Sequence, residues 1–400
     1  MSHFLISGIT GLRNRGVDAL VRSIVHELRA RDPECRITVV SKTPDYDGLR
    51  LAALDVAVVR DPYAGPIGFL RYLLVRWLRV ALLLAWSMRA YREALAGADT
   101  LLVSGGDVFS SDYGDFDRYV QHMRDARAAG LRVHLLAHSI GRFAEGDIAR
   151  WRRLERLVDH GSVRERASLD YLQGEIRSGL AWRLVADVAF LLPPAGEPFG
   201  EWLEHRVIGT RPCIVMSVSQ GVSRFAGADS HAHLDALAEL VEALLEEDPD
   251  ASVVLLPHVQ ELSVRNDDSL LVHALEARLR HTLRVSSLAG QYTANEYKAL
   301  LGRADFVVAE RMHAAIGALS QAVPTISLGY SIKFEGVMSE CYAGSRWAEA
   351  GNVQLSRFVA EPAATTAEIL DAFRSRAAMR EVLARNVPDI ISRARSAFDW

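Results

Sequence analysis

The stretch ADFVVAERMHAAIGALSQAVPTISLGYSIK, residues 304–333, decides how this sequence folds. Its first apolar run, FVVA, has the length of a buried strand, and a second run, TISL, follows after a segment of helical length. A strand, a helix and a second strand in this order form a βαβ unit, whose strands pair in parallel and are covered by helices. Arg311 and His313 fall where the first strand ends and the helix begins.

The same alternation extends through the rest of the chain. Apolar runs of strand length occur at 4–8, 37–41, 56–59, 100–104 and 133–137, and again at 213–218, 253–257, 283–287, 306–309 and 325–328. Helical periodicity at 19–29 and 119–129 separates members of the first set. The pattern predicts an α/β protein with two Rossmann-like domains in tandem and a ligand cleft between them.

Proline and glycine mark the boundary between the two predicted domains. They are concentrated in LLPPAGEPFGEW, residues 191–202. We therefore expect an N-terminal domain over 1–192, a linker over 193–202 and a C-terminal domain over 203–365. A helical segment, interrupted near Pro388, is expected to follow over 366–400.

Composition excludes several classes of function. The formal net charge of −4 gives no basic field for nucleic-acid binding. Three widely separated cysteines form neither a disulfide framework nor a metal knuckle. The apolar run at the N-terminus is too short for a secretory signal, so a cytoplasmic protein is expected. His231 and His233 lie in a stretch typical of a surface loop, and no metal site is expected there.

The strongest candidate site is the helix start that carries Arg311 and His313. Ligands of open parallel sheets bind beyond the carboxyl ends of the strands, and a helix N-terminus favours an anion. Arg311 offers a planar fork for a carboxylate or phosphate, and His313 can exchange a proton near neutral pH. Lys333 and Tyr330 follow the next strand, and His258 follows the run at 253–257. The alternative is that the arginine and histidine only cap and pair within the fold.

The N-terminal half carries further polar segments just after strand-like runs. The loop ISGITGLRNRGVDAL (6–20) presents Asn14 and Arg15 before a helix, and HLLAHSIGRF (134–143) presents His138 and Ser139. Arg164 closes a short strand in SVRERASLDYL (162–172) and could reach an anion. In VSGGDVFSSDYGDFDRY (103–119), the residues suited to a hydroxyl-rich ligand are Gly105, Gly106, Asp107, Asp112 and Tyr113. Asp107 or Asp112 could act as a general base, and a solvated acidic loop is the alternative.

Together these motifs resemble the polysaccharide pyruvyl transferase family, in the family's order and over most of the chain. The likeness runs through NRG with Asp18-Ala19, GGDVFSSDYG, HSIGRF, SVRERASLDYL and, most specifically, ERMHAAIGALSQAVPTISLGYSIKFEGVM (310–338). It departs at Arg13, where a glycine is usual, at Val17, where an acidic residue is usual, and at Ser219, where an arginine is usual. Arg224 lies a few residues beyond Ser219.

The resemblance implies a GT-B-like fold and phosphoenolpyruvate as the donor, with no further cofactor. It implies that Arg311 and His313 bind this donor in the C-terminal domain and that the N-terminal domain binds a sugar. Our hypothesis makes Arg311 the anion clamp, His313 the general acid and Asp107 the base, with Arg164 and Lys333 as secondary anion contacts. A glycosyltransferase that uses a nucleotide sugar, or a non-catalytic glycan- or anion-binding protein, are the alternatives.

Residues 67–92 form a long apolar stretch that contains arginines. Arg71, Arg76 and Arg79 would cost about 2.5–3.5 kcal/mol each at the centre of a membrane span, so a transmembrane helix is not expected. As a helix, the stretch is amphipathic and basic, and it suits either peripheral contact with the inner face of the plasma membrane or packing on the sheet with its arginines in water.

Overall fold

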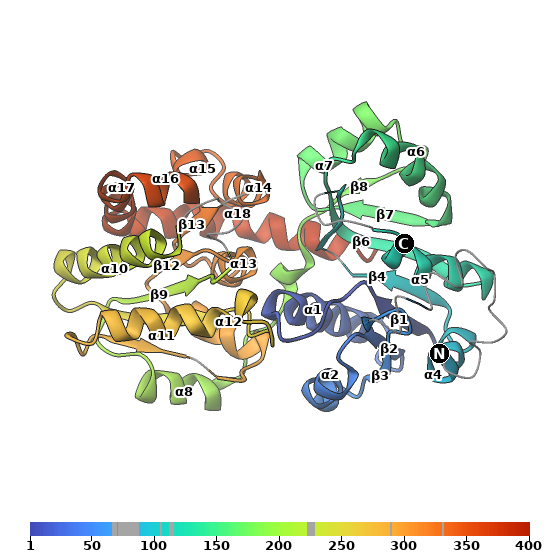
Figure 1. Ribbon diagram of the computed structural model, residues 1–400, viewed down its shortest axis with the longest axis horizontal. Coiled ribbons are helices and arrows are strands. Elements are labelled where there is room, and N and C mark those ends of the chain that lie inside the picture. The colour runs from blue at the N-terminus through green and yellow to red at the C-terminus, as the bar shows by residue number, and fades with distance from the viewer. Residues whose placement is uncertain are drawn as a thin grey trace. The chain divides into compact units, whose positions relative to one another are not determined.

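The computed structural model describes residues 1–65, 70, 88–104, 106–111, 116–221, 229–288, 290–329 and 332–400. Its contacts divide the chain into two compact units (Figure 1). Unit 1 comprises residues 1–12, 20–188 and 393–400, and unit 2 comprises residues 13–19 and 189–392. The expected linker, 193–202, includes the start of helix α8, which spans Glu197–Arg206.

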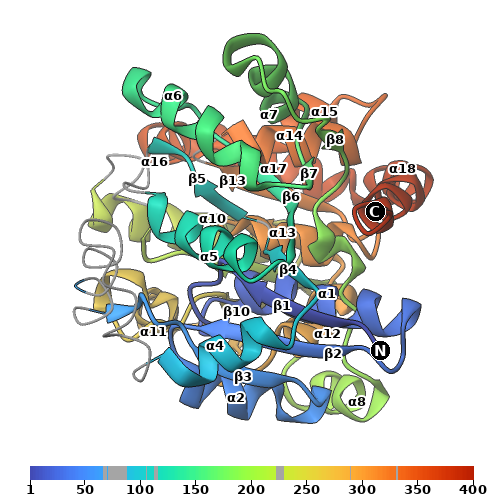
Figure 2. The ribbon, with the colours of Figure 1, turned by 90° about the vertical axis from the view of Figure 1, so that its right-hand side faces the viewer.

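Unit 1 contains an eight-stranded sheet in its described part. The strands are β1 (His3–Ser7), β2 (Arg36–Ser41), β3 (Ala57–Arg60), β4 (Thr100–Val103), β5 (Gly106–Phe109), β6 (Arg132–Ile140), β7 (His160–Val163) and β8 (Arg183–Leu184). They follow the order β3-β2-β1-β4-β6-β7-β8, with β5 paired to β6, and all of these pairs are parallel (Figure 2). This order reverses between β1 and β4, as in a Rossmann fold.

The helices of unit 1 connect these strands. They are α1 (Arg15–Arg31), α2 (Pro44–Leu51), η1 (Ala52–Leu54), α4 (Arg89–Ala96), α5 (Asp117–Ala128), α6 (Glu145–Leu154), η4 (Glu155–Leu157), α7 (Arg166–Tyr171) and η5 (Leu172–Ile176). The first residues of α1 belong to unit 2. Of the strands in this sheet, the sequence prediction found the central ones and missed β5 and β8, which are short and carry few apolar residues.

Unit 2 repeats this topology with six strands in its described part. They are β9 (Cys213–Val218), β10 (Ser252–Pro257), β11 (Val285–Ser287), β12 (Phe306–Ala309), β13 (Thr325–Gly329) and β14 (Asn352–Gln354). The order is β11-β10-β9-β12-β13-β14, again entirely parallel, and it reverses between β9 and β12. The prediction of two Rossmann-like domains in tandem is confirmed.

Helices flank the strands of unit 2 as well (Figure 1). They are η6 (Val188–Leu191), α8, α10 (Ser230–Glu247), η7 (Val264–Asn266), α11 (Asp268–Arg278), α12 (Ala294–Arg303), α13 (Met312–Leu319), α14 (Ile332–Cys341), α15 (Trp347–Ala350), α16 (Leu355–Ala360), α17 (Pro362–Arg374) and α18 (Arg376–Ser396). The expected break at Pro388 is wrong, because this proline lies inside α18 and the break falls at Ser375 instead. Burial of Val387 and Ile390 beside the proline stabilises the helix through packing.

The core of unit 1 holds a cluster of aromatic side chains. The ring of Trp151 stacks on Phe143 at a centroid distance of 5.2 Å and lies 5.2 Å from Phe109. Each such side chain contributes roughly 1.5–3 kcal/mol through burial, and aromatic pairs add about 0.5–1.5 kcal/mol. Phe109 also lies 4.9 Å from the ring of His138, so the core fixes one of the predicted site residues.

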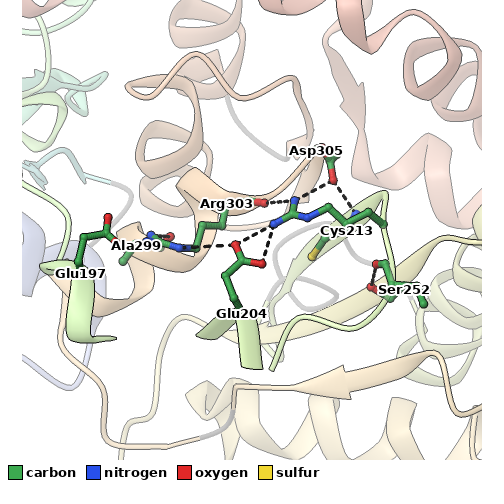
Figure 3. A network of polar contacts seen from close by, with 9 residues as sticks. Glu197, Glu204, Cys213, Ser252, Ala299, Arg303 and Asp305 are labelled. Atoms are coloured by element: carbon green, nitrogen blue, oxygen red, sulfur yellow. Dashed lines mark hydrogen bonds and ion pairs between the residues drawn. The ribbon is translucent and has the colours of Figure 1, made fainter. Parts of the chain in front are cut away.

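The amino ends of β9 and β12 are joined by an ion-pair network (Figure 3). Asp305 accepts hydrogen bonds from the Cys213 amide at 2.8 Å and from Arg211 at 3.1 Å. Arg211 also forms a two-pronged pair with Glu204. These partly exposed groups hold the edge of the sheet that lies opposite the carboxyl ends of its strands.

Candidate functional site

The carboxyl ends of β9, β10 and β12 bring polar residues together at one edge of the second sheet. Ser219 follows β9, His258 follows β10 and Glu310 follows β12. All three residues are buried. Because the strand order reverses between β9 and β12, this edge is where an open parallel sheet binds its ligand.

Arg311 is held at this edge by a fully buried carboxylate. Its Nε and Nη2 atoms donate to the two oxygens of Asp268 at 3.0 and 2.6 Å. The carboxylate of Asp268 also accepts the backbone N–H groups of Gln220 at 2.9 Å and Val259 at 2.8 Å. Asp268 thus ties the segments after β9, β10 and β12 to one another. Burial raises the pKa of Asp268, against the opposing effect of the Arg311 guanidinium.

A second buried carboxylate, that of Glu310, forms hydrogen bonds at the same edge of the sheet. Glu310 accepts the backbone N–H of Ser219 at 2.7 Å and pairs with Nε2 of His233 at 2.6 Å. Burial lowers the pKa of His233, but the Glu310 carboxylate outweighs burial and the net shift is upward. The prediction that His233 lies in a surface-like loop is wrong, because it sits on the buried face of α10.

The segment that carries Asn14 and Arg15 pairs with the residues after β10. Asn14 forms an antiparallel bridge with Val259, and the Arg15 amide donates to the His258 carbonyl at 3.0 Å. The side chain of Arg15 is fully buried, where Nη2 donates to Gln260 Oε1 at 2.9 Å. Its guanidinium carbon lies 5.8 Å from the centre of the Tyr297 ring.

His313 stands in the first turn of α13, next to the first turn of α1. A Cβ atom added to Gly16 would lie 2.4 Å from Nδ1 of His313. The Gly16 amide donates to Asn14 Oδ1 at 2.9 Å, which fixes the loop against the imidazole. The sequence prediction had placed Asn14 and Arg15 with the N-terminal domain, whereas these residues contact the same unit as Arg311 and His313.

The pKa of His258 is affected by the positive charges that lie at this edge of the sheet. Its ring is buried, and neither nitrogen has a hydrogen-bond partner among the described residues. Burial, followed by the charges of His313, Arg311 and Arg15, lowers the pKa of His258 well below its ordinary value. The imidazole is therefore neutral at physiological pH, and the surrounding cations would favour an anionic ligand.

In unit 1, a different group of predicted residues is assembled at the carboxyl ends of β6 and β7. The Ser139 hydroxyl donates to Glu165 at 2.5 Å and accepts from Nε of Arg164 at 2.8 Å. His138 lies within hydrogen-bond distance of the Val103 carbonyl, at 3.2 Å. Burial lowers the pKa of His138 to about 3, with smaller effects from the Val103 contact and the charge of Arg164.

Arg164 was expected to contact an anion of the donor. Its side chain is 2% exposed and pairs with two carboxylates, Glu165 at 3.1 Å and Asp187 at 2.5 Å. A guanidinium already neutralised by two buried carboxylates attracts a further anion weakly. The geometry therefore favours a role for Arg164 in holding the β6 and β7 ends together.

Gly106 and Asp107 lie in β5 beside this group. Gly106 has a φ of 142°, a conformation that favours glycine, and it pairs with His138. Burial lowers the pKa of His138, and the Asp107 carboxylate is a smaller opposing effect there. At Arg164, burial is outweighed by the carboxylates of Asp187, Glu165 and Asp107, which together raise the pKa. Ala137, just before His138, has a φ of 50°, an uncommon backbone conformation for this residue and one that concentrates at functional sites.

Some predicted site residues lie outside the described part of the chain. They are Gly105, Asp112, Tyr113 and Tyr330, together with the side chain of Lys333 and most of the stretch 67–92. Among the residues that the structure does describe, no three or more His, Cys, Asp or Glu side chains are grouped to hold a metal ion. Nor does any helix formed by those residues have the length and apolar character to cross a membrane.

Sequence reasoning missed the two carboxylates that organise the site, Asp268 and Glu310, as well as His233, which pairs with Glu310, and Gln260, which pairs with Arg15. Glu310 was visible as the residue between β12 and Arg311. Asp268 had a weaker signal, as the second of two aspartates at the start of a helix that begins eleven residues after the end of β10. Its pairing with Arg311 spans 43 positions and follows no local pattern.

Solved structures with a similar fold cover nearly the whole chain. A putative UDP-N-acetylglucosamine 2-epimerase from Listeria monocytogenes is 12% identical, with a TM-score of 0.63 over 99% of this chain and 94% of the other. The UDP-GlcNAc 2-epimerase from Neisseria meningitidis, bound to UDP-GlcNAc, is 12% identical, with a TM-score of 0.62 over 99% and 98%. Anabaena HepE, in complex with UDP-glucose, is 12% identical, with a TM-score of 0.56 over 100% and 99%. These likenesses show the fold alone and confirm its GT-B-like class.

A comparison with sequence models of protein families is more specific. Residues 14–332 match the model of a family described as polysaccharide pyruvyl transferase. The match covers more than half of the chain and includes Arg15, His258, Arg311 and His313.

Proposed function

This chain belongs to the polysaccharide pyruvyl transferase family, and from that membership we propose that it transfers the enolpyruvyl group of phosphoenolpyruvate to a sugar. The acceptor is a pair of hydroxyls on a surface polysaccharide or its lipid-linked precursor, and the product is a pyruvate ketal. The observation that carries the proposal is the grouping of Arg15, His258, Arg311 and His313 beside one sheet edge. Because precursors of this kind are assembled on lipid carriers, we assign the reaction to the cytoplasmic side of the plasma membrane.

The donor's charge matches this group of residues. Phosphoenolpyruvate carries a carboxylate and a phosphate on one small enol, so it needs cations on more than one side. Arg311, whose side chain is 16% exposed, would clamp one anionic group while Asp268 holds the guanidinium from behind. Arg15 is the second cation, and its charge reaches the same His258 ring. His258 itself would contribute hydrogen bonding as a neutral imidazole.

His313 would supply the proton that the reaction needs. Protonation of C3 of the enol makes C2 electrophilic, and a sugar hydroxyl oxygen then bonds to C2. A second hydroxyl of the same sugar closes the ketal as the C2–O bond to phosphate breaks. Of the two hydroxyl protons, one replaces the proton delivered to C3 and the other leaves with phosphate, so the atoms balance. General acid catalysis of this kind contributes about 10²–10⁴-fold.

The acceptor is assigned to residues of unit 1. Asp107 lies in β5, which pairs with the strand that carries His138, and it is the general base of this proposal. Ser139 and the glycine at 106 lie at the same end of the first sheet. Hydroxyl, carboxylate and backbone groups of this kind suit a polyhydroxylated ligand.

Ligand-induced stabilisation tests the proposal. Phosphoenolpyruvate at about 100 times its Kd should add roughly 2.7 kcal/mol to the free energy of unfolding. A domain of 150–250 residues gains about 2–4 °C in Tm for each kcal/mol. The shift should disappear in Arg311→Ala and persist in Arg211→Ala, which removes an arginine at the opposite edge of the same sheet.

The same assay separates the competing functions. UDP-GlcNAc and UDP-glucose serve as the nucleotide-sugar arm. A shift with either one, and none with phosphoenolpyruvate, would replace the proposal with a nucleotide-sugar glycosyltransferase. Binding of phosphoenolpyruvate without ketal formation on any sugar acceptor would favour a non-catalytic anion-binding protein.

A further inference from the structure

The segment 13–19 follows the first strand of unit 1 but makes its contacts within unit 2. Two backbone hydrogen bonds pair it with the residues after β10, Arg15 N to His258 O at 3.0 Å and Gln260 N to Arg13 O at 3.0 Å, and together they form the antiparallel bridge between Asn14 and Val259. At its far end, the buried carboxylate of Asp18 accepts the amide of Ala294, the first residue of α12, at 2.8 Å. The segment is therefore held at both ends.

Between these two attachments, Gly16 lies against the imidazole of His313. A Cβ on Gly16 would come within 2.4 Å of Nδ1 and 2.8 Å of Cγ, and within 3.1 Å of Asn14 Oδ1. Contacts under 3.0 Å essentially never occur for a real Cβ, so one of the two groups would have to move. The backbone attachments resist movement of the loop, and the imidazole is therefore the group that gives way.

Backbone strain does not explain a glycine at this position. Gly16 is not among the residues with positive φ, and it lies in the first turn of the regular helix α1. Any residue can adopt that backbone conformation. The physical reason for a glycine at position 16 is the close approach of its backbone to the imidazole of His313.

We infer that Gly16 is a positioning residue for His313, with the Nδ1 edge of the imidazole packed on the first turn of α1. The loop thereby selects the rotamer of the group that exchanges the proton. This assignment rests on the proposed function for its chemical meaning. The packing itself makes a prediction that needs no substrate.

A double-mutant cycle in thermal unfolding tests the packing. Gly16→Ala should lower the Tm by several degrees, because the new methyl group meets the ring. In the His313→Ala background the ring is gone, and Gly16→Ala should then change the Tm by no more than about 1 °C. Gly48→Ala is the matched control, because Gly48 also lies in a helix, has no positive φ and has open space around its Cβ position. An equal loss of Tm in both backgrounds would overturn the inference.

Turnover tests the positioning role. Gly16→Ala should lower kcat at least tenfold, leave the KM for phosphoenolpyruvate within about twofold, and shift the pH profile of kcat. Added to His313→Ala, it should cause no further loss, since it acts through the missing ring. A kcat and pH profile equal to those of the unsubstituted protein would refute the role. If no variant turns over phosphoenolpyruvate, the proposed function fails while the unfolding cycle still decides the packing of Gly16 on His313.

Discussion

Replacing Asp268 by asparagine probes the contact that holds the candidate site together. The carboxylate accepts four hydrogen bonds, from Arg311 Nε and Nη2 and from the amides of Gln220 and Val259. An asparagine keeps one acceptor oxygen and presents an NH₂ group where the second oxygen stood. Each carboxylate oxygen accepts two of these bonds: one oxygen accepts from Arg311 Nε and the Val259 amide, and the other from Arg311 Nη2 and the Gln220 amide. In the asparagine variant, one of these two pairs of N–H donors therefore faces the NH₂ group and loses its acceptor.

The expected cost follows from this count. Breaking a buried ion pair by removing one partner costs about 3–5 kcal/mol, and each buried donor left unsatisfied accounts for roughly 1–3 kcal/mol of such a loss. We therefore expect Asp268→Asn to lower the free energy of unfolding by about 3–5 kcal/mol. At about 2–4 °C per kcal/mol, the Tm of the transition that reports on unit 2 falls by roughly 6–20 °C.

Asp305→Asn provides a matched control in the same sheet. Asp305 also pairs with an arginine and accepts a backbone amide, but the side chains of the pair are 45% and 29% exposed (Figure 3). Exposed pairs contribute only about 0–1 kcal/mol, so this control should lose little beyond one hydrogen bond. Chemical denaturation of both variants, followed by circular dichroism, gives the two values. Equal losses for the two variants would refute the idea that a buried Asp268–Arg311 pair organises the site.

Three further predictions follow from the same geometry. His313→Ala should reduce kcat by about 10²–10⁴-fold with a Tm near that of the unsubstituted protein, and near-full turnover in a ketal assay would exclude His313 as the acid. Arg15→Met should raise the Kd for phosphoenolpyruvate at least tenfold in calorimetry, more than the same change at the exposed Arg380, and equal affinities would remove Arg15 from the anion site. Burial, with smaller effects of His160 and Arg132, lowers the pKa of His134 to about 3. The contribution of the neutral His134 to the free energy of unfolding is therefore complete above the unfolded pKa of about 6.5, and it is lost as the pH falls below that value. This loss is about 1.4 kcal/mol between pH 7.5 and 5.5, and His134→Phe should reduce the fall in unfolding free energy between these two pH values by that amount; an unchanged fall contradicts the shift.

Local patterns in the sequence were sufficient for the architecture. Apolar runs separated by helical periodicity predict parallel strands, because the period of burial reflects backbone geometry within each element. The strands 213–218 and 306–309 were predicted with the bounds observed in the structure. The position of Arg311 and His313 after β12 was likewise readable, since a strand end and a helix start are both local features.

Partners far apart in the chain were not readable in this way. The expectation for Arg164 changed because Asp187, 23 positions away, pairs with its guanidinium. The assignment of Asn14 and Arg15 changed because the chain after β1 pairs with residues 258–260. Sequence order places these residues in the first domain, whereas backbone hydrogen bonds place them in the second unit.

What the sequence by itself determined is the alternation of strands and helices, the doubled Rossmann-like plan and the membership of the family. Only the tertiary structure decided which residues meet: Arg311 with Asp268, Arg15 with Gln260, and Gly16 with His313. The physical reason is the separation along the sequence of the residues that interact. Strand and helix periodicities are set by neighbours a few residues away, whereas a buried ion pair or a close contact depends on the register of whole elements brought together by folding.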